Sequence, residues 1–309
     1  MKKDNIIFTN PILKMINSIN FHNDEINSMS IFPSGNLISV SDDKSIKIYD
    51  NNFNILQSIE NAHDDSIDYV DIKDENNFVT CSKDKTIKTW INKNNKNKFV
   101  LNKIIKNAHN RTLWKVIYCK NGNLISCSWD KTIKIWDETK KNNYQLITIL
   151  SYLNHIWSIL LLEDKNLLLS SGSGGTYFWK LITYEYIFHI KDANCYDNNG
   201  LKRIDENRII VGGDSEIINI ISICDRKIIK KIESDFRCLG IYVIPNKEIF
   251  LIGGFNDIKI YRYDIYECIL IIKNAHNGAI YGFVQVNNNL IASSGNDKII
   301  RIWSINSLI

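Results

Sequence analysis

Short runs of apolar residues that alternate with polar residues fill most of the chain, and polar turns separate these runs. A period-2 run on each side of a polar turn predicts a β-hairpin. The pattern therefore predicts an all-β protein, and its recurrence predicts a repeated unit. The recurring turns lie midway through successive segments, at residues 33–36, 74–77, 120–123, 163–166, 205–208, 245–248 and 286–289.

A large side chain in the third strand of each unit marks the same repeat. Subtracting the positions of successive markers gives spacings of 41, 46, 43, 42, 42 and 40 residues. A four-stranded propeller blade has a period of ~40–45 residues, so each unit is expected to supply four strands, named a to d here. The markers are Tyr49, Trp90, Trp136, Trp179, Ile221, Tyr263 and Trp303.

Four of the units also share a set of four side chains. Each has a histidine before strand a, a serine or threonine in strand b, an aspartate in the b–c turn and an aromatic residue in strand c. This combination resembles the WD40 repeat family, strongly in four units and weakly in three. The four sets, called tetrads below, are His22, Ser39, Asp43 and Tyr49; His63, Thr80, Asp84 and Trp90; His109, Ser126, Asp130 and Trp136; and His276, Ser293, Asp297 and Trp303.

The resemblance implies a seven-bladed β-propeller. It also implies that an N-terminal strand completes the last blade, which removes an exposed sheet edge. We therefore expect one domain over residues 1–309. Its blades are expected at approximately 21–61, 62–107, 108–150, 151–192, 193–233, 234–274 and 275–309, with residues 8–20 completing blade 7.

Blades 4 to 6 depart from the tetrad. Blade 4 has a tyrosine at the histidine position and no aspartate in its b–c segment, and blade 5 lacks both the histidine and the aromatic residue. Blade 6 lacks the histidine but keeps an aspartate and a tyrosine. The residues concerned are Tyr152 in blade 4, Asn194 and Ile221 in blade 5, and Asp235, Asp257 and Tyr263 in blade 6.

A serine, a histidine and an aspartate in one unit also suggest a hydrolytic triad. A catalytic triad needs one copy with an exposed nucleophile, whereas this set recurs in four blades. Buried hydroxyl, imidazole, carboxylate and indole groups can instead satisfy one another's hydrogen bonds. The glycine-rich run at 172–175 lacks the lysine of a phosphate-binding loop. We therefore predict no enzyme activity, no catalytic residue, no metal, no cofactor and no small-molecule substrate.

Composition limits the remaining function classes. The net charge of +4 is modest and does not favour direct contact with nucleic acid. Seven scattered cysteines indicate free thiols in a reducing compartment. The N-terminus has no apolar stretch typical of a signal peptide, and the apolar segment 147–169 is too polar to span a bilayer. We expect a cytoplasmic or nuclear protein that does not contact membranes.

Three tryptophans remain once the repeat is explained. Trp114 and Trp157 lie near the start of strand a in blades 3 and 4, and Trp129 precedes Asp130 in a b–c turn. The resemblance implies that these positions face the top surface around the channel mouth, and aromatic clusters mark binding hot spots. The predicted partner-binding residues are Trp114, Trp129, Trp157, His155 and, on blade 7, Tyr281.

These expectations lead to one preferred function and two alternatives. The preferred function is a non-enzymatic scaffold or adaptor, a monomeric propeller within a larger complex that binds a peptide or partner protein on its top face. The first alternative is a ribosome- or nucleic-acid-associated scaffold, which would require a contiguous basic face. The second is the substrate-recognition subunit of a larger complex such as a ubiquitin ligase. The fold alone does not choose the partner.

Overall fold

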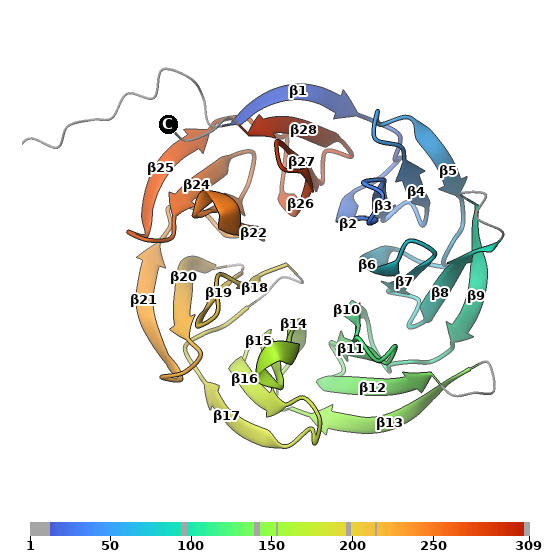
Figure 1. Ribbon diagram of the computed structural model, residues 1–309, viewed down its shortest axis with the longest axis horizontal. Coiled ribbons are helices and arrows are strands. Elements are labelled where there is room, and N and C mark those ends of the chain that lie inside the picture. Colours follow the sequence, from blue (N-terminus) through green and yellow to red (C-terminus); the bar gives the residue numbers. More distant parts are fainter. Residues whose placement is uncertain are drawn as a thin grey trace, which may run out of the picture.

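The computed structural model describes residues 13–93, 98–138, 143–152, 154–195, 199–213 and 215–305. These residues form seven antiparallel four-stranded sheets arranged as blades around a central axis (Figure 1). The expected all-β, seven-bladed propeller is confirmed. Within each blade, strand a lies nearest the axis and strand d lies at the circumference (Figure 1).

The strands follow the chain order blade by blade. Blades 1 and 2 contain β2 (Ile26–Ile31), β3 (Leu37–Ser41), β4 (Ile46–Tyr49), β5 (Ile55–Ile59), β6 (Ile67–Asp74), β7 (Asn77–Ser82), β8 (Ile87–Asn92) and β9 (Phe99–Ile105). Blades 3 and 4 contain β10 (Leu113–Tyr118), β11 (Leu124–Ser128), β12 (Thr132–Glu138), β13 (Tyr144–Ser151), β14 (Ile156–Leu162), β15 (Leu167–Gly172), β16 (Gly175–Lys180) and β17 (Tyr186–Ile190). Blades 5 and 6 contain β18 (Leu201–Arg203), β19 (Arg208–Gly213), β20 (Ser215–Ser222), β21 (Lys227–Glu233), β22 (Gly240–Ile244), β23 (Ile249–Gly253), β24 (Ile258–Arg262) and β25 (Glu267–Ile272). Blade 7 contains β26 (Ile280–Asn287), β27 (Leu290–Gly295), β28 (Ile300–Ile305) and β1 (Leu13–Ile19).

Strand β1 closes the ring by pairing with β28. The pairing is antiparallel, from Leu13 opposite Ile305 to Ile19 opposite Ile300. Leu13 and Ile19 are each 4% exposed and pack inward. The predicted closure by an N-terminal strand is therefore confirmed for residues 13–19, whereas residues 8–12 of the expected segment lie outside the described residues.

Apolar side chains fill the spaces between neighbouring blades. Seven clusters of buried residues occur among the described residues, one at each junction between adjacent blades. Strands β3 and β11 are buried along their whole length because both faces of a blade pack against its neighbours. This explains why strand b sequences contain nearly continuous apolar runs. Short 3₁₀ turns at Glu163–Lys165 and Pro245–Lys247 join strands a and b in blades 4 and 6.

Blade 6 differs from the expected register. The bulge that precedes the strand-c aromatic in blade 3, between Ile135 and Trp136, occurs in blade 6 between Ile260 and Tyr261. The expectation that Tyr263 holds this position is therefore wrong. Tyr263 lies past the end of β24, where its hydroxyl donates to the carbonyl of Pro245.

The aspartate expected in the blade 6 turn is also displaced. In blade 3, Asp130 precedes the residue with left-handed backbone, Lys131 at φ 68°, whereas Asp257 follows its counterpart Asn256 at φ 66°. Asp257 therefore does not occupy the tetrad position. The cross-strand register explains the displaced aspartate: Trp136 pairs with Leu124, 12 positions earlier, whereas Tyr261 pairs with Phe250, 11 positions earlier, so the b–c hairpin of blade 6 is one residue shorter.

Helices contribute little to this architecture. In the part of the chain that the structure describes, no helix has both the length and the apolar character needed to cross a membrane.

Ring closure predicts a strong asymmetry between the two faces of β1. Deleting residues 1–20 removes the strand and should cause aggregation or a much lower melting temperature, because β28 is left with an unpaired edge. Ile19→Asp buries a charge and should lower the free energy of unfolding by about 3 kcal/mol or more. Thermal and chemical denaturation of the purified proteins measures both effects.

Ile16→Asp is the matched control on the same strand. Ile16 is 53% exposed, so the substitution should change the free energy of unfolding by less than about 0.5 kcal/mol. Equal stability of the Ile19→Asp and Ile16→Asp variants, or a monomeric truncation with unchanged melting temperature, would contradict the closure.

Candidate functional site

A continuous chain of hydrogen bonds joins the four tetrad residues of blade 3. The indole Nε1 of Trp136 donates to Ser126 Oγ over 2.9 Å, and this hydroxyl lies 2.8 Å from His109 Nε2. His109 Nδ1 lies 2.9 Å from Asp130 Oδ2. With the imidazole proton on Nδ1, the serine donates to Nε2 and every polar atom in the chain has a partner.

The same arrangement recurs in the other three complete blades. The histidine Nδ1 lies 2.9 Å from the aspartate in each of them. In blade 1 the hydroxyl of Tyr49 takes the place of the indole N–H and lies 3.2 Å from Ser39 Oγ. The distances from histidine Nε2 to the strand-b hydroxyl are 2.7 Å for His22 and Ser39, 2.8 Å for His63 and Thr80, and 2.6 Å for His276 and Ser293.

Electrostatics keep the tetrad aspartates charged. Burial tends to raise the pKa of the Asp130 carboxyl, but hydrogen bonds from His109, Thr132 and the Asn110 backbone outweigh it and hold that pKa well below its ordinary value. Burial lowers the pKa of His109 despite the neighbouring carboxylate. The imidazole is therefore neutral at neutral pH, as the hydrogen-bond chain requires.

Blade 4 keeps a shortened form of the network. The hydroxyl of Tyr152 hydrogen-bonds to Ser170, and Trp179 Nε1 donates to the same Ser170 Oγ over 3.2 Å. Trp179 follows Ser170 by 9 residues, whereas Trp136 follows Ser126 by 10, so one residue is missing from the b–c turn of blade 4. The turn therefore has no place for the aspartate.

A β-bulge at the start of strand a presents one side chain per blade toward the top face. We use this term for the face that carries the b–c turns and the loops entering strand a. The register shifts there in blades 1, 2, 3, 4 and 7. Bulges commonly redirect a side chain next to a functional site. The residues within the five bulges are Asn27, Asp68, Trp114, Trp157 and Tyr281.

Hydrogen bonds fix the residues just before these bulges. In each of the five blades, the carbonyl of one such residue accepts a backbone N–H from the b–c turn. In blade 3, Trp129 N–H donates to the carbonyl of Thr112 over 3.0 Å. In blade 4, His155 holds the position of Thr112, and its carbonyl accepts from Ser173 over 3.3 Å. His155 therefore belongs to the same ring of top-face positions.

Four of the predicted partner-binding residues form one contact cluster, named the tryptophan cluster here. The ring centroids of Trp114 and Trp157 are 4.5 Å apart, and Trp129 lies 5.7 Å from Trp114 and 5.4 Å from Trp157. The ring of His155 lies 5.5 Å from that of Trp129, and its Nδ1 donates to the Trp129 carbonyl over 2.7 Å. The cluster bridges blades 3 and 4.

The tryptophan cluster is half-buried, and its polar groups are not satisfied by the protein. All three rings keep part of their surface accessible. The three indole Nε1 atoms are buried, yet none has a hydrogen-bond acceptor within the described residues. Two of the ring pairs meet edge to face, at 70° and 82°. The rings therefore pack against one another without the acceptors that buried indoles usually have.

Tyr281 lies apart from the tryptophan cluster. It is on β26, across the channel from β14 (Figure 1). Its hydroxyl donates to Glu25 Oε2 over 3.2 Å, and its carbonyl accepts from Asn199 Nδ2 over 3.1 Å. Tyr281 thus joins blade 7 to blades 1 and 5.

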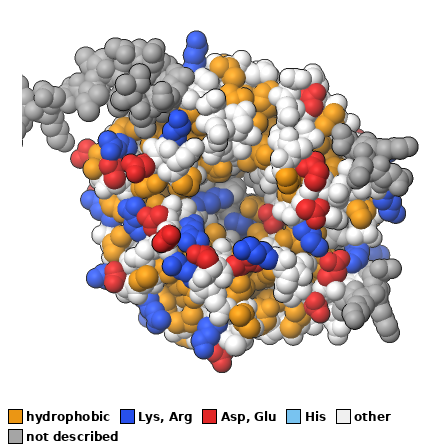
Figure 2. All heavy atoms as spheres, in the orientation of Figure 1, with side chains coloured by type: hydrophobic (Ala, Val, Ile, Leu, Met, Phe, Trp, Pro, Cys, Tyr) orange, Lys and Arg blue, Asp and Glu red, His pale blue; other side chains and the backbone are white. Residues whose placement is uncertain are grey.

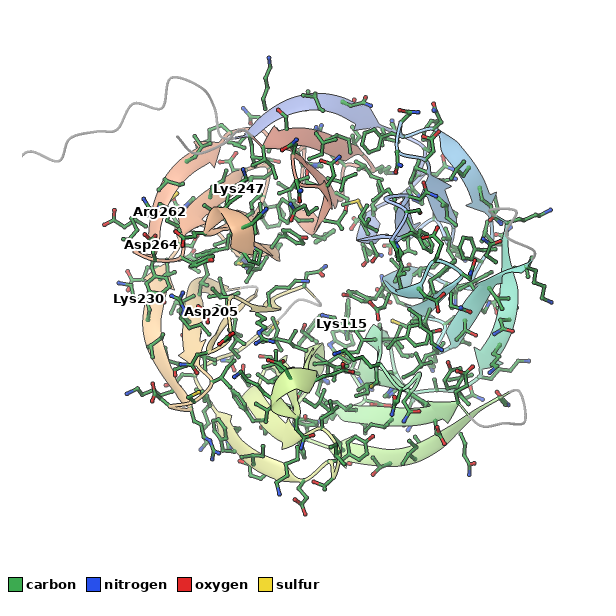
Figure 3. The ribbon with its side chains drawn as sticks, in the orientation of Figure 1. Lys115, Asp205, Lys230, Lys247, Arg262 and Asp264 are labelled. Atoms are coloured by element: carbon green, nitrogen blue, oxygen red, sulfur yellow. The ribbon has the colours of Figure 1, made fainter. Side chains whose placement is uncertain are left out.

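Charged residues on the inner strands were not identified from the sequence. The ring is hollow at its centre (Figure 2), and Lys115 lies at the inner side of blade 3 (Figure 3). Its buried Nζ lies 5.0 Å from the ring centroid of Tyr69 on blade 2. Burial raises the pKa of Asp71 to about 6, while its carboxylate accepts the Tyr118 N–H over 2.8 Å. The sequence could have indicated Lys115 and Asp71, because each charged residue has an apolar residue on either side of it within its strand.

Metal binding has no support from the clusters found. Within the described ranges, no group of three or more His, Cys, Asp or Glu side chains is arranged to hold a metal ion.

Comparison with known proteins points to one repeat family. The family model for the WD domain, G-beta repeat, matches residues 13–50, 54–90, 101–137 and 266–304. Each of the four matched segments contains one complete tetrad, including its histidine. No curated protein matches the chain.

The tetrad geometry predicts that the turn aspartate stabilises the fold. Asp130→Ala removes the charged acceptor of the buried His109 Nδ1–H and leaves only Thr132 Oγ1, at 3.1 Å, so it should lower the free energy of unfolding by about 1–3 kcal/mol. Asp257→Ala is the matched control, because this carboxylate pairs with the exposed Lys273 rather than with a histidine. Denaturant unfolding that gives the same stability for both variants would show that the tetrad adds nothing.

The lowered histidine pKa values predict a pH dependence. Burial depresses the pKa of His63, His109 and His276 below 6.5. The unfolded chain then binds more protons than the folded chain as the pH falls through 6.5, so the free energy of unfolding decreases. The melting temperature should therefore drop between about pH 7 and pH 5, and further near pH 4 as the unfolded-state aspartates protonate. A melting temperature that rises on acidification over this range would contradict neutral, buried imidazoles.

Proposed function

Because the chain belongs to the WD40-repeat family and closes into a seven-bladed ring, we propose that it is a non-enzymatic interaction scaffold. It binds a peptide segment or partner protein through the top face of blades 3 and 4. WD40 propellers are generally scaffolds for protein interaction, which supports the class of function. The tryptophan cluster supports the choice of surface.

The observation that carries the proposal is the identity of the clustered residues. A residue that only fills space between blades needs no polar atom, and phenylalanine would serve without burying an unpaired N–H. An unpaired buried donor costs about 1–3 kcal/mol. The fold therefore gives no reason for three indoles at Trp114, Trp129 and Trp157. Recognition of a partner does, because tryptophan is enriched at binding hot spots and each of these rings keeps an accessible surface for a partner side chain.

Acidic side chains on the neighbouring arc favour a protein partner over nucleic acid. Asp68 occupies the blade 2 bulge, and burial raises its pKa well above the ordinary value. Lys83 opposes this shift, whereas the nearby Asp42 and Asp65 add to it. Because this shift favours the neutral form of the buried Asp68, repulsion of a phosphate backbone comes from the accessible Asp42 and Asp65, which suit a partner segment with basic side chains.

Two kinds of substitution distinguish a loss of binding from a loss of folding. Trp114→Ala and Trp157→Ala should abolish partner capture and shift the melting temperature by only a few degrees. Trp114→Phe with Trp157→Phe keeps most of the ring surface and removes two N–H donors. This double variant should bind at least about tenfold more weakly than wild type, at equal or higher stability. Affinity purification of tagged protein from its own cells, followed by mass spectrometry, identifies the partners that depend on these residues.

Ile229→Ala on the outer strand of blade 5 is the control for nonspecific loss of partners, because Ile229 is exposed and lies on another blade. Unfolding of both alanine variants would mean that the tryptophans are core residues. Unchanged partner profiles in stable variants would exclude this surface as the binding site.

A further inference from the structure

Blade 4 contains a pocket of about 880 Å³ near its outer edge. Its walls come from β16, β17 and the loops at the top of the blade. The volume falls within the range of ligand-binding pockets. The tryptophan cluster does not line this pocket, so it is a second candidate site.

The missing turn residue explains why space opens at this place. In blade 3, Lys134 on strand c spans the corresponding region, and its Nζ donates to the Ala108 carbonyl over 2.7 Å. In blade 4 the equivalent residue is Tyr177, and Gly174 stands in the shortened turn. Loss of the lysine, the aspartate and the histidine replaces a filled polar network with a concave, ring-lined surface.

Five aromatic rings form the walls of the pocket. Tyr186, Trp179 and Tyr152 form a row with ring centroids 5.6 and 5.2 Å apart, and each pair meets edge to face. Tyr177 lies 4.7 Å from Tyr152 and stacks on His189 at 4.8 Å. Tyr186 is 52% exposed, and its hydroxyl lies 2.8 Å from His189 Nδ1. Tyr186 is therefore the most exposed of the five rings, and Trp179, 8% exposed, is the most buried.

The polar groups of the pocket restrict the charge of its occupant. Among the described lining residues there is no carboxylate, and Lys191 supplies a positive charge at the rim. Asn194 Oδ1 is buried in the pocket without a hydrogen-bond donor from the described residues. A cationic ligand such as a quaternary ammonium is therefore disfavoured. The occupant is expected to be neutral or acidic.

We propose that this pocket binds a proline-rich peptide segment in the polyproline II conformation, with an acidic residue beside Lys191. Aromatic-lined grooves recognise such segments because prolyl side chains pack on the accessible ring surfaces. The backbone of a polyproline II segment makes no internal hydrogen bonds, so its carbonyls can accept from pocket hydroxyls and amides.

Selection from a library of random 12-residue peptides displayed on phage tests the proposal, because the library favours no particular partner. Wild-type protein is the bait, and enriched peptides are synthesised and titrated by fluorescence anisotropy. Peptides with two or more prolines should be enriched. Their affinity should fall at least about tenfold for Tyr186→Ala and should also fall for Lys191→Glu. Ile182→Ala is the matched control, because Ile182 is 75% exposed on the same blade and does not line the pocket.

The outcomes separate this site from the tryptophan cluster. Proline-containing peptides that bind Trp114→Ala normally but lose affinity for Tyr186→Ala and Lys191→Glu support the proposal, whatever the result at the top face. The proposal fails if no enriched peptide depends on Tyr186, or if the dependent peptides lack proline. Saturable binding on a glycan array that Tyr186→Ala abolishes, with no such peptide, assigns the pocket to a carbohydrate and also overturns it. Circular dichroism of each variant excludes loss of folding as the cause.

Discussion

A buried hydroxyl on strand b connects the core of each complete blade to its top face. In blade 3 this hydroxyl belongs to Ser126, which accepts from Trp136 and donates to His109. His109 in turn holds Asp130, and Asp130 holds the turn that begins the next strand. The geometry of the top face is thus set by hydrogen bonds that begin deep between the sheets. Trp129 is positioned by this chain because it precedes Asp130 directly.

The two candidate sites use the repeat in opposite ways. The tryptophan cluster depends on an intact blade 3, whose network fixes Trp129 and through it the imidazole of His155. The blade 4 pocket exists because that network is interrupted, with Tyr152 and Tyr177 where other blades have histidine and lysine. The complete network of blade 3 therefore supports the tryptophan cluster, and the interrupted network of blade 4 leaves a pocket.

The sequence predicted the features that depend on local spacing. Seven units, the closing strand and the tetrad positions follow from short-range patterns, and the ring in Figure 1 has this arrangement. The predicted register of blade 6 was wrong because Tyr261 and Tyr263 are two residues apart, and a period-2 pattern does not show that β24 ends at Arg262, between them. The blade 4 pocket was not predicted from the sequence, because its aromatic lining comes from β16, β17 and an inter-blade loop. Contacts between side chains from different strands and loops depend on tertiary packing, and the spacing of residues along the sequence does not predict them. The functional role of the top-face residues stays a prediction.

Closure of the ring by β1 has a consequence for synthesis of the protein. Ile19 pairs with Ile300, so β1 leaves the ribosome well before its partner strand is made. At ~5–20 residues per second this interval is roughly 15–60 s. During that time β1 presents free backbone groups beside the exposed side chains of Met15 and Ile16. Because this pairing joins strands that are far apart in the sequence, we expect closure to be a slow step of folding and the stage at which a nascent chain most needs protection from aggregation.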